Sequence, residues 1–429
     1  MSTALEFMLA ARRSEMQGLQ ALAVTCQLVG EISQLVHALQ RERGFSNMYL
    51  GGQAERYRRS LDTLSGDATR CEQAVRKAFD GMDLERSCGA EKARLFTRVA
   101  FVLHGLDGLP TLRRRVREQQ LDAQEATHGF TRLIAGLLAV VFEAADSAVD
   151  PRITRALVAL FNFMQGKELA GQERAAGVCG FVAGYFEQPQ CSRLGFLEEA
   201  QQRCFDTFLE FAEQDTRAAW ATLCSGELMG EIARLRQVAL RTSEQSQVQS
   251  SMGEVWFELT SQRIDSMKQV EDQLAERLQS LCEHKIQQAS ADLDSQRRLT
   301  RRLHQLDEEG NAPAARLYNV QATELEALPG ERIGNHMQRS VLELVHEQTV
   351  RLQHLHDELD AARRSLSERK LIERAKGVLM TRQGLNEEQA FRALQGAAME
   401  RGQKLIEVAQ SILNYNELLQ PSAQQTQAR

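Results

Sequence analysis

Two arginines in similar sequence surroundings are the clearest candidates in this chain for binding an anion. The stretch QRERGFSNMYLGG (40–52) follows an apolar segment and places Arg43 before small residues and an aromatic. The stretch GQERAAGVCGFVAG (171–184) repeats this order, and its Arg174 aligns with Arg43. A guanidinium is a planar fork of N–H donors that can bind two oxygens of an anion at once. The weak internal repeat therefore predicts a pseudo-symmetric pair of arginines on two helices of one bundle.

Positive charge gathers towards the C-terminal end. The chain has a formal net charge of −6, but residues 363–429 contain 11 Lys and Arg against 7 Asp and Glu. That segment therefore carries +4 and the remainder −10. An acidic body with a basic tail is typical of proteins that contact a polyanion through the basic end, although an ordinary solvated face would give the same balance.

The sequence contains no catalytic, metal-binding or membrane-spanning signature. The motifs of P-loop enzymes, α/β-hydrolases and zinc proteases are missing, so we expect no enzyme, no catalytic residue and no cofactor. Eight scattered cysteines without a C-x-x-C pair argue against a zinc site and a disulfide framework. The most apolar run, LIAGLLAVVF (133–142), is about half as long as the ~20 residues that a bilayer requires. We therefore expect a reduced, cytoplasmic protein without a membrane segment.

Helices must position the arginines, because the composition favours helix throughout. Only six prolines occur, none of them between Pro189 and Pro313, and period-two runs of β-branched residues are absent. We predict an all-α fold with breaks at residues 79–83, 105–110, 149–151, 186–190, 307–313 and 328–334. This layout predicts an N-terminal extension (1–30), a helical bundle (31–285), a helical connector (286–362), a three-helix C-terminal unit (363–419) and a disordered tail (420–429).

The connector contains a heptad seam. Its members recur at alternating spacings of four and three: Val341, Val345, Gln348, Leu352, Leu355, Leu359, Ala362 and Leu366. This is the a/d pattern of a two-stranded coiled coil and predicts a homodimer. A single amphipathic helix packed on its own chain would fit the same pattern. No breaker separates this helix from the C-terminal unit.

The C-terminal unit has clear helix ends and a family resemblance. Gly384 and Gly402 end two helices, and Asn386 with Gln389 forms a capping box that opens the second. The unit resembles the ANTAR family in the stretches RAKGVLM (374–380), LNEEQAFRAL (385–394), AAMERGQKL (397–405) and VAQSI (408–412). The resemblance covers the whole unit and implies binding to paired hairpin loops in a leader mRNA, which prevents a terminator from forming.

Basic side chains and one glycine of this unit are the candidate RNA contacts: Lys370, Arg374, Lys376, Gly377, Arg382, Arg392, Arg401 and Lys404. Each cation would add a salt-sensitive phosphate contact. The unit has no row of aromatics on which bases could stack. DNA binding by a helix-turn-helix is the rival interpretation, although the turns after Gly384 and Gly402 lack its usual geometry.

The bundle resembles the NIT domain, which senses nitrate and nitrite. The matching stretches are LQRERGFSNMYLGG (39–52), AGQERAAGVCGF (170–181) and VWFELTSQRIDSMKQVEDQL (255–274). The resemblance covers roughly residues 35–280 and implies that Arg43, Arg174 and Arg263 contact the anion, with Arg41 and Ser46 as weaker candidates. Nitrate is a planar monoanion whose oxygen pairs match the guanidinium fork, and lysine could not offer that geometry. Nitrite would fit more loosely.

Alternative partners exist for each arginine. Arg43, Arg174 and Arg263 could instead pair with Glu42, Glu173 and Asp265 on solvated helix faces. Trp256, within the third stretch, is expected to be a core residue.

Together these patterns predict a switch. Two partly buried guanidiniums about 5–6 Å apart repel by about 3 kcal/mol at an effective dielectric constant of 20, and an anion between them would draw their helices together. The two resemblances imply a nitrate- or nitrite-responsive transcription antiterminator, whose C-terminal unit is freed to bind RNA and acts on the RNA polymerase elongation complex indirectly. A helical signalling scaffold and a ligand-responsive DNA-binding regulator are the alternatives.

Overall fold

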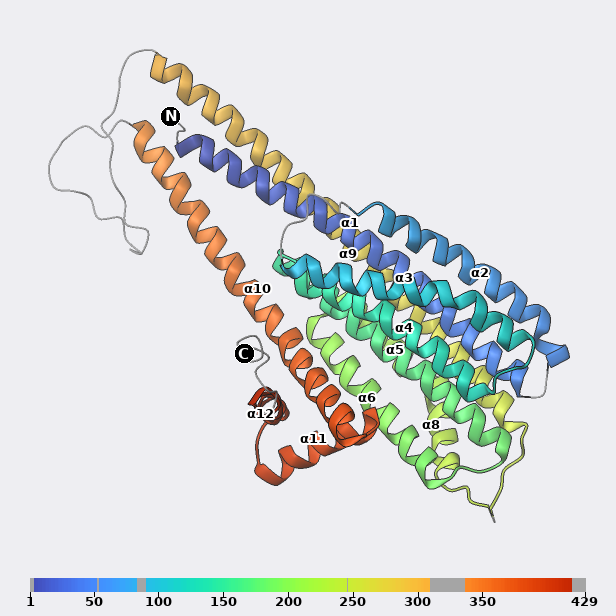
Figure 1. Ribbon diagram of the computed structural model, residues 1–429. Coiled ribbons are helices and arrows are strands. Elements are labelled where there is room, and N and C mark those ends of the chain that lie inside the picture. Colours follow the sequence, from blue (N-terminus) through green and yellow to red (C-terminus); the bar gives the residue numbers. More distant parts are fainter. Residues whose placement is uncertain (1–3, 52–53, 83–89, 245, 309–335, 419–429) are drawn as a thin grey trace, which may run out of the picture.

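The protein is helical almost throughout the residues that the computed structural model describes, 4–51, 54–82, 90–244, 246–308 and 336–418 (Figure 1). Within them the only bridge outside helices joins Ser243 to Ser246, so the all-α prediction is confirmed. The helices are α1 (Ala4–Leu50), α2 (Ala54–Asp80), α3 (Ala90–Arg117), α4 (Ala123–Ser147), α5 (Pro151–Ala183), α6 (Gln188–Phe211), α7 (Gln214–Cys224), α8 (Glu227–Ala239), α9 (Met252–Glu308), α10 (His336–Gln383), α11 (Glu387–Arg401) and α12 (Leu405–Leu418).

Helices α1 and α5 lie at the centre of the bundle. Helix α1 packs on α2, α4 and α9, and α5 packs on α4, α6 and α9. One stripe of α1, comprising Leu28, Ile32, Leu35 and Leu39, is fully buried at helical spacing. The next position of this stripe is occupied by Arg43. Helix α5 is buried on nearly every side, and Arg174 is among its buried residues, so the packing of both helices carries an arginine into the core.

Most of the predicted helix breaks coincide with real helix ends. Helix α4 ends at Ser147, and the side chain of Asp150 accepts hydrogen bonds from the first backbone amides of α5. Gly184 ends α5 in the left-handed conformation with φ of +88°. Of the predicted break at 307–313, residues 307 and 308 still belong to α9, which extends to Glu308, and the rest lies outside the described residues, as does the break at 328–334.

The predicted break at 105–110 is wrong, because α3 continues through it. Pro110 lies inside this helix, where it removes one backbone hydrogen bond at a cost of about 3 kcal/mol. Leu106 and Leu109 are fully buried in the main core. Their burial offsets the loss, so tertiary packing overrides the local signal for a break.

The predicted connector is built from the ends of two long helices. Helix α9 passes through residue 285, the predicted end of the bundle, and α10 continues from His336 into the C-terminal unit without a break. Of the heptad seam, Leu359 and Leu366 are buried, and Leu366 belongs to the main core of the bundle. At that end of the seam the helix packs on its own chain. The side chains of the other seam residues lie outside the described ones.

Two helices are long and apolar enough to cross a membrane by length and composition alone. They comprise residues Leu9–Leu50 and Ala123–Ser147, and 50% and 61% of their apolar windows are buried within the bundle. Core helices of a soluble protein satisfy the same criterion. Here both helices pack on other parts of the chain through their apolar faces.

Candidate anion-binding site

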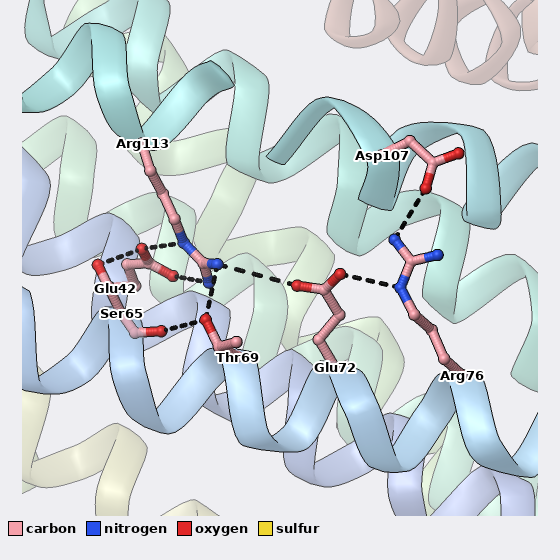
Figure 2. Close-up of polar contacts among 7 residues, drawn as sticks. All are labelled: Glu42, Ser65, Thr69, Glu72, Arg76, Asp107 and Arg113. Carbon is pink, nitrogen blue, oxygen red and sulfur yellow. Dashed lines mark hydrogen bonds and ion pairs between the residues drawn. The ribbon is translucent and has the colours of Figure 1, made fainter. Parts of the chain in front are cut away.

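Arg43 is fully buried and bonded to a carboxylate from another helix. Its Nη1 and Nη2 atoms lie 2.6 and 3.1 Å from the two carboxylate oxygens of Glu168 on α5. Nη1 also donates to the hydroxyl of Thr131 on α4, at 2.8 Å. The alternative partner Glu42 points elsewhere: it forms a bidentate ion pair with Arg113 of α3, at 2.7 and 2.9 Å (Figure 2).

Arg174 is the second buried guanidinium, and within the described part of the chain none of its hydrogen bonds goes to a carboxylate. Its Nη1 donates to the hydroxyl of Ser261 on α9 at 2.9 Å, and its Nη2 donates to the main-chain carbonyl of Gln40 at 2.6 Å. The guanidinium also lies over the ring of Phe257, 5.3 Å from its centroid. Burial, and then the positive charge of Arg43, lower the pKa of Arg174 to about 9, which leaves it charged at neutral pH.

The two arginines reach across to each other's helix. A Cβ atom at Gly44, next to Arg43, would lie 2.5 Å from Nη2 of Arg174. A Cβ atom at Gly171, one turn before Arg174, would lie 2.5 Å from Nη2 of Arg43. Each guanidinium therefore occupies the space that a glycine leaves open on the opposite helix. The pseudo-symmetric pair that the internal repeat predicts is present in three dimensions.

Arg263 lies in a separate polar cluster. Its Nη1 is 3.5 Å from Glu173, the partner that the alternative interpretation gave to Arg174. Glu173 also forms a bidentate pair with Arg236 of α8, at 2.6 and 2.9 Å, and accepts a bond from Gln201. Burial lowers the pKa of Arg263 to about 10, although Glu173 opposes that shift. The structure therefore brings Arg43 and Arg174 together and directs Arg263 to another face of α5.

The two weaker candidates differ in position. Arg41 is partly buried, and its charge is close enough to lower the pKa values of Arg174 and His37. Ser46 is buried and donates its hydroxyl to the main-chain carbonyl of Glu42 at 2.8 Å, within its own helix. A ligand would have to compete with that bond for the Ser46 hydroxyl.

Sequence reasoning missed most of the groups that surround the arginine pair: Gln40, Thr131, Glu168, Gln172 and Ser261. Glu168 had one usable signal, because it stands with Lys167 inside an otherwise apolar stretch of a predicted core helix. The others carry no such signal, because short polar side chains are common on helices and only the packing of α1, α4, α5 and α9 brings them together.

The local charge favours an additional anion. The pair Arg43 and Arg174 carries two positive charges, and Glu168 supplies one negative charge. The Nε atoms of both arginines are buried and make no hydrogen bond within the described part of the chain. Buried polar atoms without a partner are uncommon and indicate a place for a further hydrogen-bonding group.

The predicted RNA contacts of the C-terminal domain are mostly exposed. Exposed positions comprise Arg374, Gly377, Arg382, Arg392, Arg401 and Lys404. Lys376 differs, since it is buried between Glu373 and Glu387, at 2.8 and 2.9 Å. Burial lowers the pKa of Lys376, but these two carboxylates outweigh it and raise the pKa above its ordinary value. Lys376 therefore joins α10 to α11 in this conformation.

The C-terminal domain is docked on the bundle. Figure 1 shows α10 running back along the bundle to bring α11 to the end of α6, with α12 on the other side of α10. Lys370 pairs with Asp146 at 3.0 Å, and Arg392 donates to the carbonyl of Ser192 at 3.3 Å. The ring of Phe391 lies against Phe196 of α6, with centroids 6.1 Å apart. Two of the predicted RNA contacts are thus engaged by the bundle.

These features define a class of protein: a helical bundle with a buried cationic site, joined by a long helix to a small, docked domain with exposed basic residues. Residues 34–279 match the NIT family, described as nitrate and nitrite sensing, and residues 360–413 match the ANTAR domain. The chain belongs to the NIT family and carries a C-terminal ANTAR domain.

Two known proteins are similar over nearly the whole chain. A nitrate regulatory protein from Klebsiella oxytoca is 37% identical over 408 residues, which cover 95% of this chain and 94% of that protein. The solved structure of the NasR transcription antiterminator is 33% identical and has a TM-score of 0.59, covering 96% of this chain and 99% of that one. The similarity therefore includes both domains and the segment between them.

Proposed function

We propose that this protein is a nitrate- and nitrite-responsive transcription antiterminator. Anion binding at Arg43 and Arg174 frees the ANTAR domain to bind leader-RNA hairpins and prevents termination of an operon for nitrate or nitrite assimilation. The observation that carries the proposal is the crossed pair of buried guanidiniums in a chain whose ANTAR domain is docked through two of its candidate RNA contacts.

The docked arrangement supports an inhibited state. Lys370 cannot contact a phosphate while it is bonded to Asp146, and Arg392 lies against the Ser192 carbonyl. A nitrate ion that binds only the undocked state shifts the population by the ratio of its affinities for the two states. The ligand therefore needs no direct contact with the RNA-binding domain.

The remaining elements of the proposal concern partners and location. The protein works in the cytoplasm, where leader transcripts are made, and acts as a regulator rather than an enzyme. It affects the RNA polymerase elongation complex indirectly, through the RNA. The first part of the α10 seam, residues 341–355, forms a two-stranded coiled coil in a homodimer. Analytical ultracentrifugation of the full chain tests the dimer, which a single monomeric species would contradict.

A filter-binding titration tests the central proposal. A leader RNA with two paired hairpins is titrated with the full chain, with and without nitrate, over a series of salt concentrations. We expect tight binding only with nitrate, and a slope of log affinity against log salt of roughly −0.7 to −0.9 per phosphate contact. Equal RNA binding with and without nitrate would contradict the sensor function. No RNA retention in either condition would contradict RNA binding and favour the helical scaffold.

Alanine variants in the same titration identify the anion contacts. Arg43→Ala and Arg174→Ala should each abolish the response to nitrate, because each removes one of the two facing guanidiniums. Arg263, Arg41 and Ser46 are the further proposed contacts, and their alanine variants should weaken the response. A full nitrate response in Arg43→Ala would contradict the assignment of the site.

A further inference from the structure

The carboxylate of Glu168 is held like a bound planar anion. It is buried, with 2% of its side chain exposed. Its Oε1 accepts bonds from Nη1 of Arg43 at 2.6 Å and from the amide of Gln172 at 3.1 Å. Its Oε2 accepts bonds from Nη2 of Arg43 at 3.1 Å and from the amide of Gln40 at 2.9 Å. Both oxygens are thus saturated by donors from α1 and α5.

Nitrate and a carboxylate present the same recognition edge. Both are planar, carry one negative charge and offer two oxygens that match a guanidinium fork. Since Nη1 and Nη2 of Arg43 are both bonded to Glu168, the edge that these two nitrogens form is closed to nitrate in this conformation, and only Nε is left without a partner among the described residues. Among the described residues, Arg174 donates to Ser261 and to the Gln40 carbonyl but to no carboxylate, and it is near enough to Arg43 for that charge to lower its pKa.

We infer that Glu168 is an internal counter-anion that nitrate displaces from Arg43. This inference rests on the proposed function and assigns Glu168 the role of setting the affinity for the ligand. In the empty protein, Glu168 neutralises Arg43 and stabilises the fold. In the bound protein, nitrate takes its place between the two guanidiniums, and the carboxylate leaves the fork.

The Glu168 carboxylate can move away from Arg43 towards Gln172. Gln172, one turn further along α5, is only partly buried, and its amide oxygen accepts a bond from exposed Arg193 of α6 at 3.2 Å. The neighbouring residue of α6, Ser192, is the one whose carbonyl binds Arg392 of the ANTAR domain. Displacement of Glu168 towards Gln172 therefore disturbs the segment of α6 that holds the docked domain.

Isothermal calorimetry of the full chain with sodium nitrate tests the inference. Glu168→Gln keeps the shape of the side chain but removes the competing charge, so nitrate should bind at least tenfold more tightly, a change of about 1.4 kcal/mol. Half-maximal RNA binding should move to a lower nitrate concentration by a similar factor. Glu143→Gln is the matched control, since it removes a buried carboxylate of α4 that faces Arg94 and Arg98 instead. Its nitrate affinity should stay within twofold of the parent.

The outcomes separate this inference from the proposed function. If the parent binds nitrate and Glu168→Gln binds it equally or more weakly, Glu168 is not a competitor and the inference is wrong, while the nitrate-sensing function stands. If only Glu168→Gln binds nitrate, the inference is supported and the parent's function as a sensor fails. If neither binds, both are wrong. If Glu168→Gln does not fold, Glu168→Asp takes its place in the test. The shorter aspartate side chain loses the bidentate contact with Arg43, so this variant should bind nitrate more tightly than the parent.

Discussion

Single residues of the bundle explain how two like charges come to share its interior. Arg43 takes the next position in a stripe of leucine and isoleucine on α1, and Arg174 lies in the interior of α5, which is buried on nearly every side. Each arginine needs the missing side chain of a glycine on the other helix, Gly171 or Gly44. The site therefore requires small residues at these positions as strictly as it requires the guanidiniums.

Substitution of Gly171 should disable the site without removing a charge. In Gly171→Ala the new methyl group would meet Nη2 of Arg43. The Arg43 guanidinium is held by bonds from Nη1 to Thr131 and from Nη2 to Glu168, and it must give them up to move. We expect at least a tenfold loss of nitrate affinity by calorimetry. Gly30→Ala on α1 is the control, because its Cβ would meet nothing within 4 Å, and it should bind nitrate like the parent. An unchanged affinity in Gly171→Ala would show that Arg43 need not lie against α5.

His37 makes the stability of the bundle sensitive to acid. Burial, and then the charges of Lys167, Lys268, Arg41 and Arg174, lower its pKa from 6.5 to about 2. Between these two values the unfolded chain binds a proton that the folded chain does not, so stability falls as the pH drops below 6.5. This residue should account for a loss of about 1.4 kcal/mol between pH 7.5 and pH 5.5.

Urea unfolding at those two pH values measures this contribution. His37→Asn should lose correspondingly less stability on acidification, because asparagine does not titrate. His356→Asn is the control, since His356 is exposed on α10 and its substitution should leave the pH dependence of the parent intact. Equal acid sensitivity of His37→Asn and the parent would contradict the assignment.

At the scale of helices, buried ion pairs set how α1 is oriented about its axis. Glu42 and Arg43 are neighbours and point about 100° apart around the helix. Arg43 faces α4 and α5, whereas Glu42 binds Arg113 of α3 and the hydroxyl of Ser65 of α2 (Figure 2). The contacts of Glu42 therefore hold α1 in the rotation that directs Arg43 towards Glu168 and the proposed anion site.

Removal of Arg113 should be costly to the fold. Arg113→Ala leaves the carboxylate of Glu42 buried without its ion-pair partner, which should lower the free energy of unfolding by about 3–5 kcal/mol. Arg117→Ala on the same helix breaks a solvent-exposed pair with Asp62 and should cost less than about 1 kcal/mol. Urea unfolding measures both variants. Similar small losses in the two would mean that the Glu42 pair contributes little to holding α1.

At the scale of the whole molecule, α10 brings the ANTAR domain back against the bundle. The interface between the ANTAR domain and the bundle combines an aromatic contact at Phe391, hydrogen bonds and the Lys370 ion pair. Arg369 adds a bond to Asn162 and lies over the ring of Phe161. These contacts add to the packing of Leu366 of α10 in the main core of the bundle. Between α11 and α6 the contacts among the described residues are polar and aromatic, so a ligand with a modest difference in affinity can open that part of the interface.

A substitution on the bundle side of this interface should allow the protein to bind RNA in the absence of nitrate. Phe196→Ala removes the ring against Phe391 and leaves every ANTAR residue unchanged, so RNA binding without nitrate should rise several-fold in the filter assay. Phe101→Ala is the control, because this residue is 51% exposed on α3, and it should keep the nitrate requirement. If RNA binding by Phe196→Ala still requires nitrate as it does in the parent, the contact with the bundle is not what prevents the ANTAR domain from binding RNA.

Local sequence determined the helical elements and the candidate arginines. The few prolines, the capping residues Asn386 and Gln389 and the glycines 384 and 402 act within one or two turns, so their effects can be predicted without the fold. Pro110 was misjudged because the burial that sustains its helix comes from other parts of the chain. The arginine motifs likewise predicted the pair Arg43 and Arg174 on two helices.

Tertiary structure alone decided the partners of these arginines. Arg43 pairs with Glu168, 125 positions away, and not with its neighbour Glu42. Arg174 donates to Ser261 and to the Gln40 carbonyl, while Arg263 takes Glu173. Neighbouring residues on a helix point in different directions, so charges adjacent in sequence seldom meet, and the packing of α1, α5 and α9 selects which distant groups do. The sequence therefore determined which residues could bind an anion, and packing decided which carboxylate occupies the fork of Arg43.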